Sequence, residues 1–236
     1  MEILNKKIVV FGGTSGIGLS TTILLSKMKA ECIYAISRNP EKPNLNDISN
    51  VELVKMDVLD ENNLSLFFEK IGKYDVLINA ATGGERALGP FMNMDLEGYR
   101  NSFKKLWGYT NTVRLGLSQL SKNGCIVLVS GSPARKCKPG QIALASVGGA
   151  VEAFSRSLAS EIKPIRINIV SPGIIDTPMV ALEGKDREDF YKNATKDNLI
   201  PRAGKADEVS QAILFAIQND FITGTTIDVD GGWLNS

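Results

Sequence analysis

Two patterns of hydrophobic and polar residues alternate along this chain. In the first pattern, consecutive apolar residues form runs of strand length, which are typical of parallel strands covered on both faces. These runs lie at residues 8–11, 32–36, 51–56, 76–79, 125–130, 165–170 and 225–229. In the second pattern, apolar residues recur at helical spacing, at 16–28, near 44–49, and at 61–71, 97–121, 141–162 and 206–217. The alternation predicts an α/β fold with a doubly wound parallel sheet and right-handed crossovers.

Residues 176–204 depart from this alternation. The segment begins with D-T-P, is rich in charge, and contains Phe190 and Tyr191. We predict that it is a substrate loop standing above the strand ends, where loops of such sheets carry function. A pair of solvated surface helices is the alternative. Because no Pro/Gly-rich linker or low-complexity tract interrupts the sequence, we interpret residues 1–236 as a single domain.

Composition narrows the possible classes of function. The chain has 236 residues, 43% of them hydrophobic, and a net charge of +1. This near-neutral balance gives no electrostatic reason to expect nucleic acid or an anionic membrane as a partner. No apolar run reaches the ~18 residues of a membrane span, and the start M-E-I-L-N-K-K lacks the apolar core of a signal peptide. We therefore expect a cytoplasmic protein.

The supply of catalytic side chains is restricted. Histidine is absent, which excludes Ser-His-Asp and Cys-His catalysis as well as histidine metal sites, and we predict no bound metal. Acid–base chemistry must then use Tyr, Lys, Asp, Glu, Cys or water. The three cysteines show no C-x-x-C spacing, and we interpret Cys32 and Cys125 as small hydrophobic residues inside strands.

A glycine-rich motif, G-G-T-S-G-I-G at residues 12–18, follows the first predicted strand and leads into a helix. Glycines there permit a tight turn and a close approach of the backbone to a pyrophosphate, and the helix N-terminus adds free N–H groups. We predict a dinucleotide site; a glycine turn without a ligand is the alternative. The predicted contacts are Gly12, Thr14, Ser15, Gly16, Ile17 and Gly18.

The end of the second predicted strand indicates which dinucleotide binds. An acidic residue that would bind the ribose 2′-OH of NAD is common at this position, but here Ser37 is followed by Arg38. A guanidinium matches a 2′-phosphate in charge and forked geometry. We therefore predict NADP(H) rather than NAD(H), with a solvated arginine as the alternative.

Together with these motifs, several others resemble the short-chain dehydrogenase/reductase family, over about residues 6–233. They are M-D-V at 56–58, N-A-A-T at 79–82, S-P-G-I-I-D-T-P at 171–178 and T-G-T-T-I-D-V-D-G-G at 223–232. The resemblance implies one Rossmann-type domain with a seven-stranded parallel sheet. It implies that Asp57 holds the adenine amino group and that Thr177 meets the nicotinamide carboxamide. It also places Val58, Asn79, Ala80, Pro172, Gly173 and Ile175 at the cofactor.

The family's catalytic set is replaced in this sequence. In the family, a tyrosine donates the proton, a lysine lowers the tyrosine's pKa, a serine orients the substrate, and an asparagine completes the set. Matching the motifs puts Leu144 at the tyrosine, Gly148 at the lysine, Gly131 at the serine and Lys105 at the asparagine. The lost side chains should leave an unfilled space above the nicotinamide, and protein interiors resist voids. Either a small-residue helix packs tightly against a neighbouring subunit, or the space is used.

Lys105 is the candidate that would use this space. Tyr109 lies one helical turn later, so the two side chains share a helix face and would form a displaced acid pair. The alternative is a surface lysine and a packed tyrosine. Ser130 and Ser132 flank the serine position and remain able to bind a carbonyl oxygen. Arg135, Lys136 and Lys138 follow in the same loop, where they either receive an anionic substrate group or are solvated.

Three functions fit these observations. The first is an NADP(H)-dependent oxidoreductase acting on a small-molecule carbonyl or alcohol, with Lys105, Tyr109, Ser130 and Ser132 as catalytic residues. The second is a non-catalytic NADP(H)-binding protein, and the third is an isomerase or lyase on the same fold. The resemblance further implies a homodimer or homotetramer formed through the helices predicted at 97–121 and 141–162.

Overall fold

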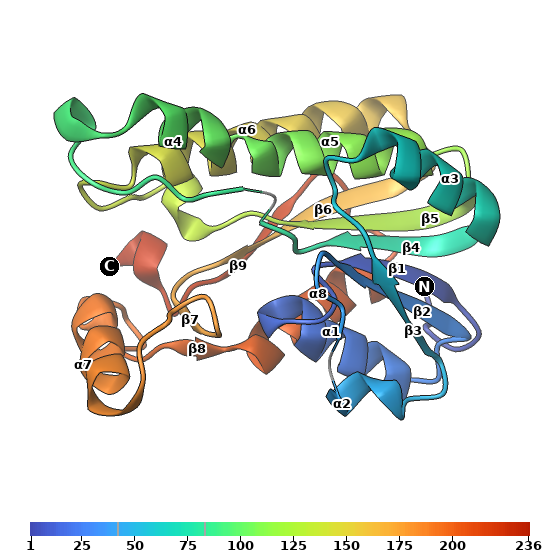
Figure 1. Ribbon diagram of the computed structural model, residues 1–236, viewed down its shortest axis with the longest axis horizontal. Coiled ribbons are helices and arrows are strands. Elements are labelled where there is room, and N and C mark those ends of the chain that lie inside the picture. Colours follow the sequence, from blue (N-terminus) through green and yellow to red (C-terminus); the bar gives the residue numbers. More distant parts are fainter. Residues whose placement is uncertain (42, 83) are drawn as a thin grey trace.

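The computed structural model describes residues 1–41, 43–82 and 84–236, and its centre is a seven-stranded sheet. The strand order is β3-β2-β1-β4-β5-β6-β9, and every neighbouring pair is parallel (Figure 1). The strands are β1 (Lys7–Phe11), β2 (Cys32–Ser37), β3 (Val51–Lys55), β4 (Tyr74–Asn79), β5 (Leu120–Val129), β6 (Arg166–Pro172) and β9 (Thr226–Val229). Each of the apolar runs predicted as strands therefore forms a strand of this sheet.

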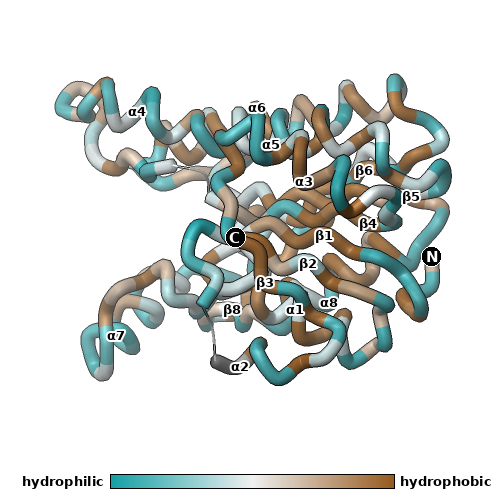
Figure 2. Tube along the Cα trace, turned by 45° about the vertical axis from the view of Figure 1, so that its right-hand side comes forward, coloured by the Kyte–Doolittle hydropathy of each residue, from teal (hydrophilic) through white to brown (hydrophobic). Residues whose placement is uncertain are grey.

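Helices cover both faces of the sheet. One layer contains α3 (Glu61–Ile71), α4 (Leu96–Ser102), α5 (Lys104–Gly116) and α6 (Ile142–Glu161). The opposite layer contains α1 (Gly16–Lys27) and α8 (Ala206–Gln218), with α2 (Pro43–Asn46) near the sheet edge (Figure 1). Figure 2 shows the most hydrophobic segments along the central strands, between the two layers.

The two faces of the sheet have separate cores, which explains why the strands read as continuous apolar runs. Phe11, Leu77 and Leu128 point into the core under α3, α5 and α6. Val10 and Val127 point into the core under α1 and α8. Adjacent residues of one strand thus enter different cores, and neither face needs polar positions.

The prediction of one helix over 97–121 is wrong. The chain forms α4 and then α5, which ends at Gly116, and β5 begins at Leu120. A Cβ atom on Gly116 would lie 2.6 Å from Phe68 Cζ, so the end of α5 packs directly on the aromatic core. Tyr74 Oη donates a hydrogen bond of 3.0 Å to the Gly116 carbonyl. Because most of the first residues of β5 are polar, the hydrophobic pattern did not indicate that the strand begins there.

Residues 176–204 do not form the pair of surface helices that was the alternative to a substrate loop. Within this segment the structure has one helix, α7 (Gly184–Thr195), which lies at the end of the molecule where the strand carboxyl ends point (Figure 1). The short parallel strands β7 (Ile175–Asp176) and β8 (Gly204–Lys205) close its base. Arg187 donates to the Thr177 carbonyl at 2.9 Å and pairs with the Asp176 carboxylate, which fixes α7 to the segment that follows β6.

None of the helices in the described ranges combines the length and apolarity needed to cross a bilayer.

Candidate active site

A cavity of about 390 Å³ opens at the carboxyl ends of the strands. It lies where the strand order reverses between β1 and β4, which is where doubly wound sheets bind ligands. Its lining comes from the ends of β1, β2, β3 and β4, the start of α1, and the segment after β7. The lining residues are Phe11, Gly12, Ser15, Gly16, Ile17, Gly18, Ile36, Ser37, Arg38, Met56, Asp57, Val58, Ala80, Ala81, Thr82, Thr177, Pro178 and Met179.

The glycine loop forms one wall of this cavity, and side chains are excluded from it. A Cβ on Gly18 would lie 2.1 Å from the Gly12 carbonyl oxygen. Gly12 has a φ of +77°, and its Cβ would lie 2.9 Å from the backbone of Ala80. Ser15 precedes α1, but its side chain does not cap the helix. The first N–H groups of the helix therefore have no partner in the Ser15 side chain and face the cavity. A backbone cradle at a helix N-terminus fits the pyrophosphate of a dinucleotide.

The structure brings together most of the predicted cofactor residues. Gly12, Ser15, Gly16, Ile17, Gly18, Ser37, Arg38, Asp57, Val58, Ala80 and Thr177 line the cavity. Thr14, Asn79, Pro172, Gly173 and Ile175 are not among the lining residues. Thr14 donates to Ser37 Oγ at 2.9 Å, and Asn79 donates to Thr112 Oγ1 at 2.9 Å. Thr14 thus supports a lining residue without belonging to the lining.

Sequence reasoning missed part of the lining. The missed residues are Phe11, Ile36, Met56, Ala81, Thr82, Pro178 and Met179. Met56, Ala81, Thr82 and Pro178 lie inside the motifs at 56–58, 79–82 and 171–178, although no contact was predicted for them. Phe11, Ile36 and Met179 directly adjoin a predicted residue or a motif. Taking every residue of each motif together with its immediate neighbours would have found them.

Arg38 stands exposed at the mouth of the cavity. Within the ranges that the structure describes, it forms no ion pair with a carboxylate. Asp57, on the neighbouring strand end, uses one carboxylate oxygen to accept from the Leu59 N–H at 3.0 Å. The guanidinium is therefore available to a ligand that carries negative charge at this end of the cavity.

Lys105 extends from the first turn of α5 toward the end of β5. Its half-buried ammonium donates to the Ser130 carbonyl at 3.2 Å and lies 5.5 Å from the centre of the Tyr109 ring. Burial, reinforced by the positive charge of Arg86, lowers the pKa of Lys105 to about 8. A lysine in this condition can release a proton near neutral pH.

Tyr109 does not form an acid pair with Lys105. Its side chain is 1% exposed, and its hydroxyl donates to the Val129 carbonyl at 2.9 Å. Burial raises the pKa of the phenol far above its ordinary value. The shared helix face is real, but the phenol packs into the core under α3, α5 and α6, as the alternative interpretation described.

The space expected at Gly148 is closed within the chain itself. A Cβ on Gly148 would lie 2.9 Å from Ala134 Cβ and 3.3 Å from Ser130 Oγ. Ala134 belongs to the short turn η2 (Ser132–Ala134), which packs on α6. The Ser130 hydroxyl is within 3.3 Å of the Gly148 carbonyl, and Ser132 is buried at the start of the turn. Lys105, Ser130 and Gly148 are thus contiguous.

The basic loop after Ser132 is neither free for a substrate nor simply solvated. Arg135 binds the Asp228 carboxylate at 2.9 Å and lies 3.4 Å from the Glu152 carboxylate. The ammonium groups of Lys136 and Lys138 lie 4.3 and 4.8 Å from the Trp233 ring centre. Lys138 also donates to a carbonyl of α7 at 3.1 Å. The charged groups of this loop hold the C-terminal segment and α7 in place.

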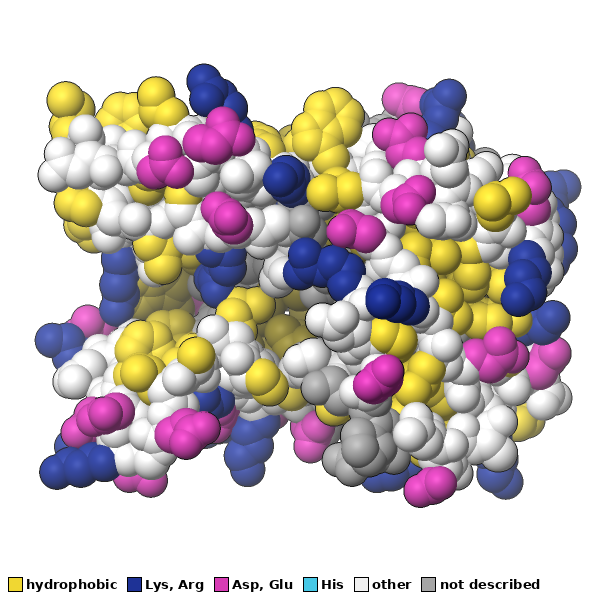
Figure 3. Space-filling model, in the orientation of Figure 1, with side chains coloured by type: hydrophobic (Ala, Val, Ile, Leu, Met, Phe, Trp, Pro, Cys, Tyr) yellow, Lys and Arg dark blue, Asp and Glu magenta, His cyan; other side chains and the backbone are white. Residues whose placement is uncertain are grey.

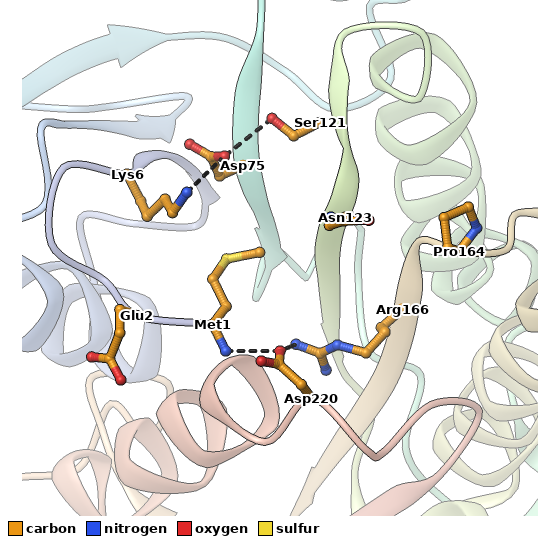
Figure 4. A pocket seen from close by; sticks show the side chains of 9 residues that line it. All are labelled: Met1, Glu2, Lys6, Asp75, Ser121, Asn123, Pro164, Arg166 and Asp220. Carbon is orange, nitrogen blue, oxygen red and sulfur yellow. Dashed lines mark hydrogen bonds and ion pairs between the residues drawn. The ribbon is translucent and has the colours of Figure 1, made fainter.

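A second cavity, of about 440 Å³, lies at the opposite end of the sheet (Figure 4). Its charged groups pair with one another: the Met1 amine with Asp220 at 2.7 Å, Arg166 with Asp220 at 3.3 Å, and Lys6 with Asp75 at 3.4 Å. It contains none of the motifs, and its ion pairs join the amino ends of the strands. We interpret it as structural.

Known proteins resemble the chain over nearly its whole length. A family profile described as Enoyl-(Acyl carrier protein) reductase matches residues 12–234. The chain is 30% identical to a 3-oxoacyl-[acyl-carrier-protein] reductase of Rattus norvegicus, covering 97% of this chain and 98% of that protein. It is 31% identical to 3-oxoacyl-[acyl-carrier-protein] reductase FabG of Thermotoga maritima, covering 98% and 99%.

Solved structures share the fold. A small-chain dehydrogenase in complex with NADPH superposes with a TM-score of 0.83 at 31% identity, covering 98% of this chain and 100% of that one. ElxO with NADP bound superposes with a TM-score of 0.90 at 26% identity, covering 99% and 100%. Both relatives hold a dinucleotide of the kind for which the glycine cradle is shaped.

Proposed function

Because the chain belongs to the short-chain dehydrogenase/reductase family, we propose that it is an NADP(H)-dependent oxidoreductase acting on a carbonyl or alcohol. One observation carries this proposal. The cavity runs from Arg38 at its mouth, which pairs with no carboxylate among the described residues, past a backbone cradle, to Thr177. A protein that used only the adenine end of a dinucleotide would have little need for a site that extends so far.

Different residues of the cavity bind different parts of the cofactor. Arg38 and Ser37 bind the 2′-phosphate, and Asp57 and Val58 bind the adenine. The first turn of α1 binds the pyrophosphate, and Thr177 orients the nicotinamide. NADPH supplies a hydride when it is bound, and the protein's task is to position the carbonyl and deliver the proton.

Lys105 is the proposed proton donor, in place of the tyrosine that the family uses. We assign Leu144 and Gly148 to the positions of the family's tyrosine and lysine, and neither residue can donate a proton. Lys105 donates to the carbonyl of Ser130, whose hydroxyl lies against Gly148, so its ammonium lies next to the residue that adjoins the position of the missing lysine. With its pKa lowered to about 8, it is a stronger acid than an ordinary lysine and still protonated at neutral pH.

The serines have different proposed roles. Ser130 holds Lys105 through its carbonyl, and its hydroxyl donates to the Gly148 carbonyl at 3.3 Å, so Ser130 is assigned to positioning Lys105. Ser132 is 4% exposed and starts the turn that fills the space beside Gly148. Tyr109 positions Lys105 by packing beneath its ammonium rather than by exchanging a proton.

The proposal is tested by NADPH oxidation with a panel of carbonyl compounds, comparing Lys105→Met with the wild-type protein. We expect a loss of kcat of about 10²- to 10⁴-fold, the usual contribution of a general acid. Lys104→Met is the matched control, because Lys104 is the exposed neighbour on the same helix. Tyr109→Phe should keep turnover while lowering stability. Equal turnover in Lys105→Met and Lys104→Met would refute the assignment.

The close packing at Gly148 favours a second candidate, a non-catalytic NADP(H)-binding protein. It predicts tight NADPH binding without oxidation of NADPH by any carbonyl compound. A third candidate, an isomerase or lyase on this fold, predicts a changed product with no net change in the redox state of the cofactor. Product analysis by mass spectrometry alongside NADPH absorbance separates the three.

We also propose a homo-oligomer formed through α5 and α6. Trp107 exposes 61% of its surface on α5, and Ile142 exposes 38% on α6. Trp107→Glu should lower the mass measured by light scattering if this helix face forms the subunit contact. An unchanged mass would place the contact elsewhere or show a monomer.

A further inference from the structure

Two cationic side chains near the cofactor cavity have no acidic partner. Arg86 and Lys105 form no ion pair with any carboxylate in the part of the chain that the structure describes. Arg135 differs, because it is neutralised by Asp228 and Glu152. Positive charges that a protein leaves uncompensated at a site are available to an anionic ligand.

Arg86 is held in place by the residues on either side of it. On one side, a Cβ on Gly84 would lie 2.3 Å from the Asn101 carbonyl oxygen, so the loop rests directly on the junction of α4 and α5. On the other side, the Ala87 N–H donates to Ser102 Oγ at 3.0 Å, and Ser102 is 4% exposed. Arg86 is therefore carried by a docked loop beside the first turn of α5, where Lys105 begins.

The guanidinium of Arg86 reaches across to the opposite rim of the site. It contacts the Sδ atom of Met179, a residue that lines the cofactor cavity. A thioether is a weak acceptor, so most of the five N–H donors of the guanidinium remain available. Figure 3 shows basic side chains along the upper edge of the hollow that separates the α4 end of the molecule from the α7 end. Arg86 thus bridges the two sides that enclose the substrate space.

We propose that Arg86 and Lys105 select a substrate with a carboxylate next to the reacting carbonyl, that is, a small oxo acid or the matching hydroxy acid. Arg86 binds the carboxylate through its forked donors, and Lys105 faces the carbonyl oxygen. The inference rests on the proposed oxidoreductase function and names its substrate class. In this arrangement Arg86 recognises the substrate anion. The loop at 135–138 does not, because its charged groups already bind other parts of the protein.

The mutual repulsion of the two cations supports this arrangement. The loop that carries Arg86 rests on Ser102 and against Lys104, beside Lys105, and the charge of Arg86 contributes to the lowered pKa of Lys105. A bound carboxylate would relieve that repulsion and keep Lys105 protonated for proton donation. Binding of the substrate anion and readiness of the acid are then coupled.

The test measures binding of oxamate, a small carboxylate, against oxamide, its uncharged counterpart, by calorimetry on the protein saturated with NADPH and again without it. We expect oxamate to bind at least tenfold more tightly than oxamide. Arg86→Gln should weaken oxamate about 10- to 100-fold, as for loss of a charged hydrogen bond, and leave oxamide unchanged. Arg86→Lys should retain part of the preference. Arg114→Gln, an exposed arginine of α5, should behave as the wild-type protein.

A pH series provides a readout that a purely structural arginine would not change. Oxamate affinity should fall as pH rises above about 8, where Lys105 loses its proton. In Arg86→Gln this fall should move to higher pH, because the repelling charge is gone. The wild-type comparison of oxamate with oxamide remains decisive even if Arg86→Gln proves unstable.

The outcomes separate this inference from the proposed function. Equal binding of oxamate and oxamide, or an unaffected Arg86→Gln variant, overturns the inference. NADPH oxidation with 2-oxo acids no faster than with their methyl esters overturns it too, while leaving the oxidoreductase in place. Charge-selective binding that depends on Arg86, without NADPH oxidation by any carbonyl compound, supports the anion site and overturns the oxidoreductase.

Discussion

The cofactor side and the proposed catalytic side of this site are specified by the sequence in different ways. On the cofactor side, the decisive residues are glycines whose missing side chains let backbone pack on backbone, Gly12 against Ala80 and Gly18 against Gly12, which shapes one wall of an open cavity. On the proposed catalytic side, Gly148 also lacks a side chain, and there the side chains of Ala134 and Ser130 occupy the space. Glycine therefore shapes an open cavity on one side of the site and allows a turn to close the other side.

This difference shows why one side is easier to interpret than the other. A backbone cradle depends on turn geometry, which a short motif of fixed spacing encodes. Acid–base chemistry depends on single functional groups, and these can move to another element. Lys105 reaches the site from α5, whereas Leu144 and Gly148 lie on α6. On the proposed assignment, the family's binding motif is kept while its catalytic pair is replaced.

The largest expected effect comes from a substitution that displaces the backbone of the glycine loop. Gly18→Ala places a methyl group 2.1 Å from the Gly12 carbonyl oxygen, so the loop must move. We expect loss of NADPH binding and a destabilisation of about 3 kcal/mol or more. Gly72→Ala is the control, because Gly72 has a φ of +63° but nothing within 4 Å of its Cβ position. That control should cost about 1 to 3 kcal/mol of backbone strain and keep NADPH binding. Loss of NADPH binding in both variants would mean that the loss follows from destabilisation and not from a displaced cradle.

The next effect tests selection between the two dinucleotides. Arg38→Ala should weaken NADPH binding about 10- to 100-fold, the range for loss of a charged hydrogen bond, and leave NADH binding within about twofold. Parallel fluorescence titrations at constant salt measure both affinities. The difference should shrink at high salt, because exposed charges are screened. A uniform loss for both dinucleotides would assign Arg38 to the pyrophosphate instead of the 2′-phosphate.

Neighbouring glycines of α6 sharpen the comparison within one helix. Gly148→Ala introduces a contact of 2.9 Å with Ala134 Cβ and should destabilise the protein by about 1 to 3 kcal/mol. Gly149→Ala meets only the Ala134 carbonyl oxygen, at 3.9 Å, and should stabilise by up to about 1 kcal/mol through helix propensity. Urea unfolding gives both values. If both substitutions raised the free energy of unfolding, or both lowered it, the packing of the turn against α6 would not decide the effect of an added side chain.

The smallest effect is a pH dependence of stability caused by Lys105. Its folded-state pKa is about 8, below its ordinary value, so between these pH values the unfolded chain binds more protons and stability rises with pH. Lys105→Met removes the cost of burying the charge, and we expect it to stabilise by about 1 kcal/mol at pH 7 and by less at pH 9.5. Thermal unfolding at the two pH values measures this, with Lys104→Met as the control. A pH-independent gain would mean that the pKa of Lys105 is the same in the folded and the unfolded protein.

The strands were predictable because parallel strands buried on both faces need apolar residues at every position. The run at 8–11 enters two different cores with alternate residues, and no polar position interrupts it. The polar start of β5, by contrast, gave no such signal and was placed inside a helix. Hydrogen bonding to Tyr74, which is distant in sequence, decides where that helix ends.

The cofactor cradle was predictable from local spacing, but the proposed catalytic side depends on contacts between distant segments. The Tyr109 hydroxyl turns toward the Val129 carbonyl, which only the packing of α5 on β5 determines. Gly148 meets Ala134 across a turn that the sequence gives no reason to place there. Arg86 had no motif at all, and its relation to Lys105 follows from the docking of its loop on Ser102.

Titration of the purified wild-type protein with NADPH and with NADH, followed by nicotinamide fluorescence at constant salt, tests the central claim most directly. Our account predicts saturable NADPH binding at least about tenfold tighter than NADH binding, because an exposed Arg38 stands at the mouth of an intact cradle. Failure of both dinucleotides to bind, or equal affinity for the two, would contradict it.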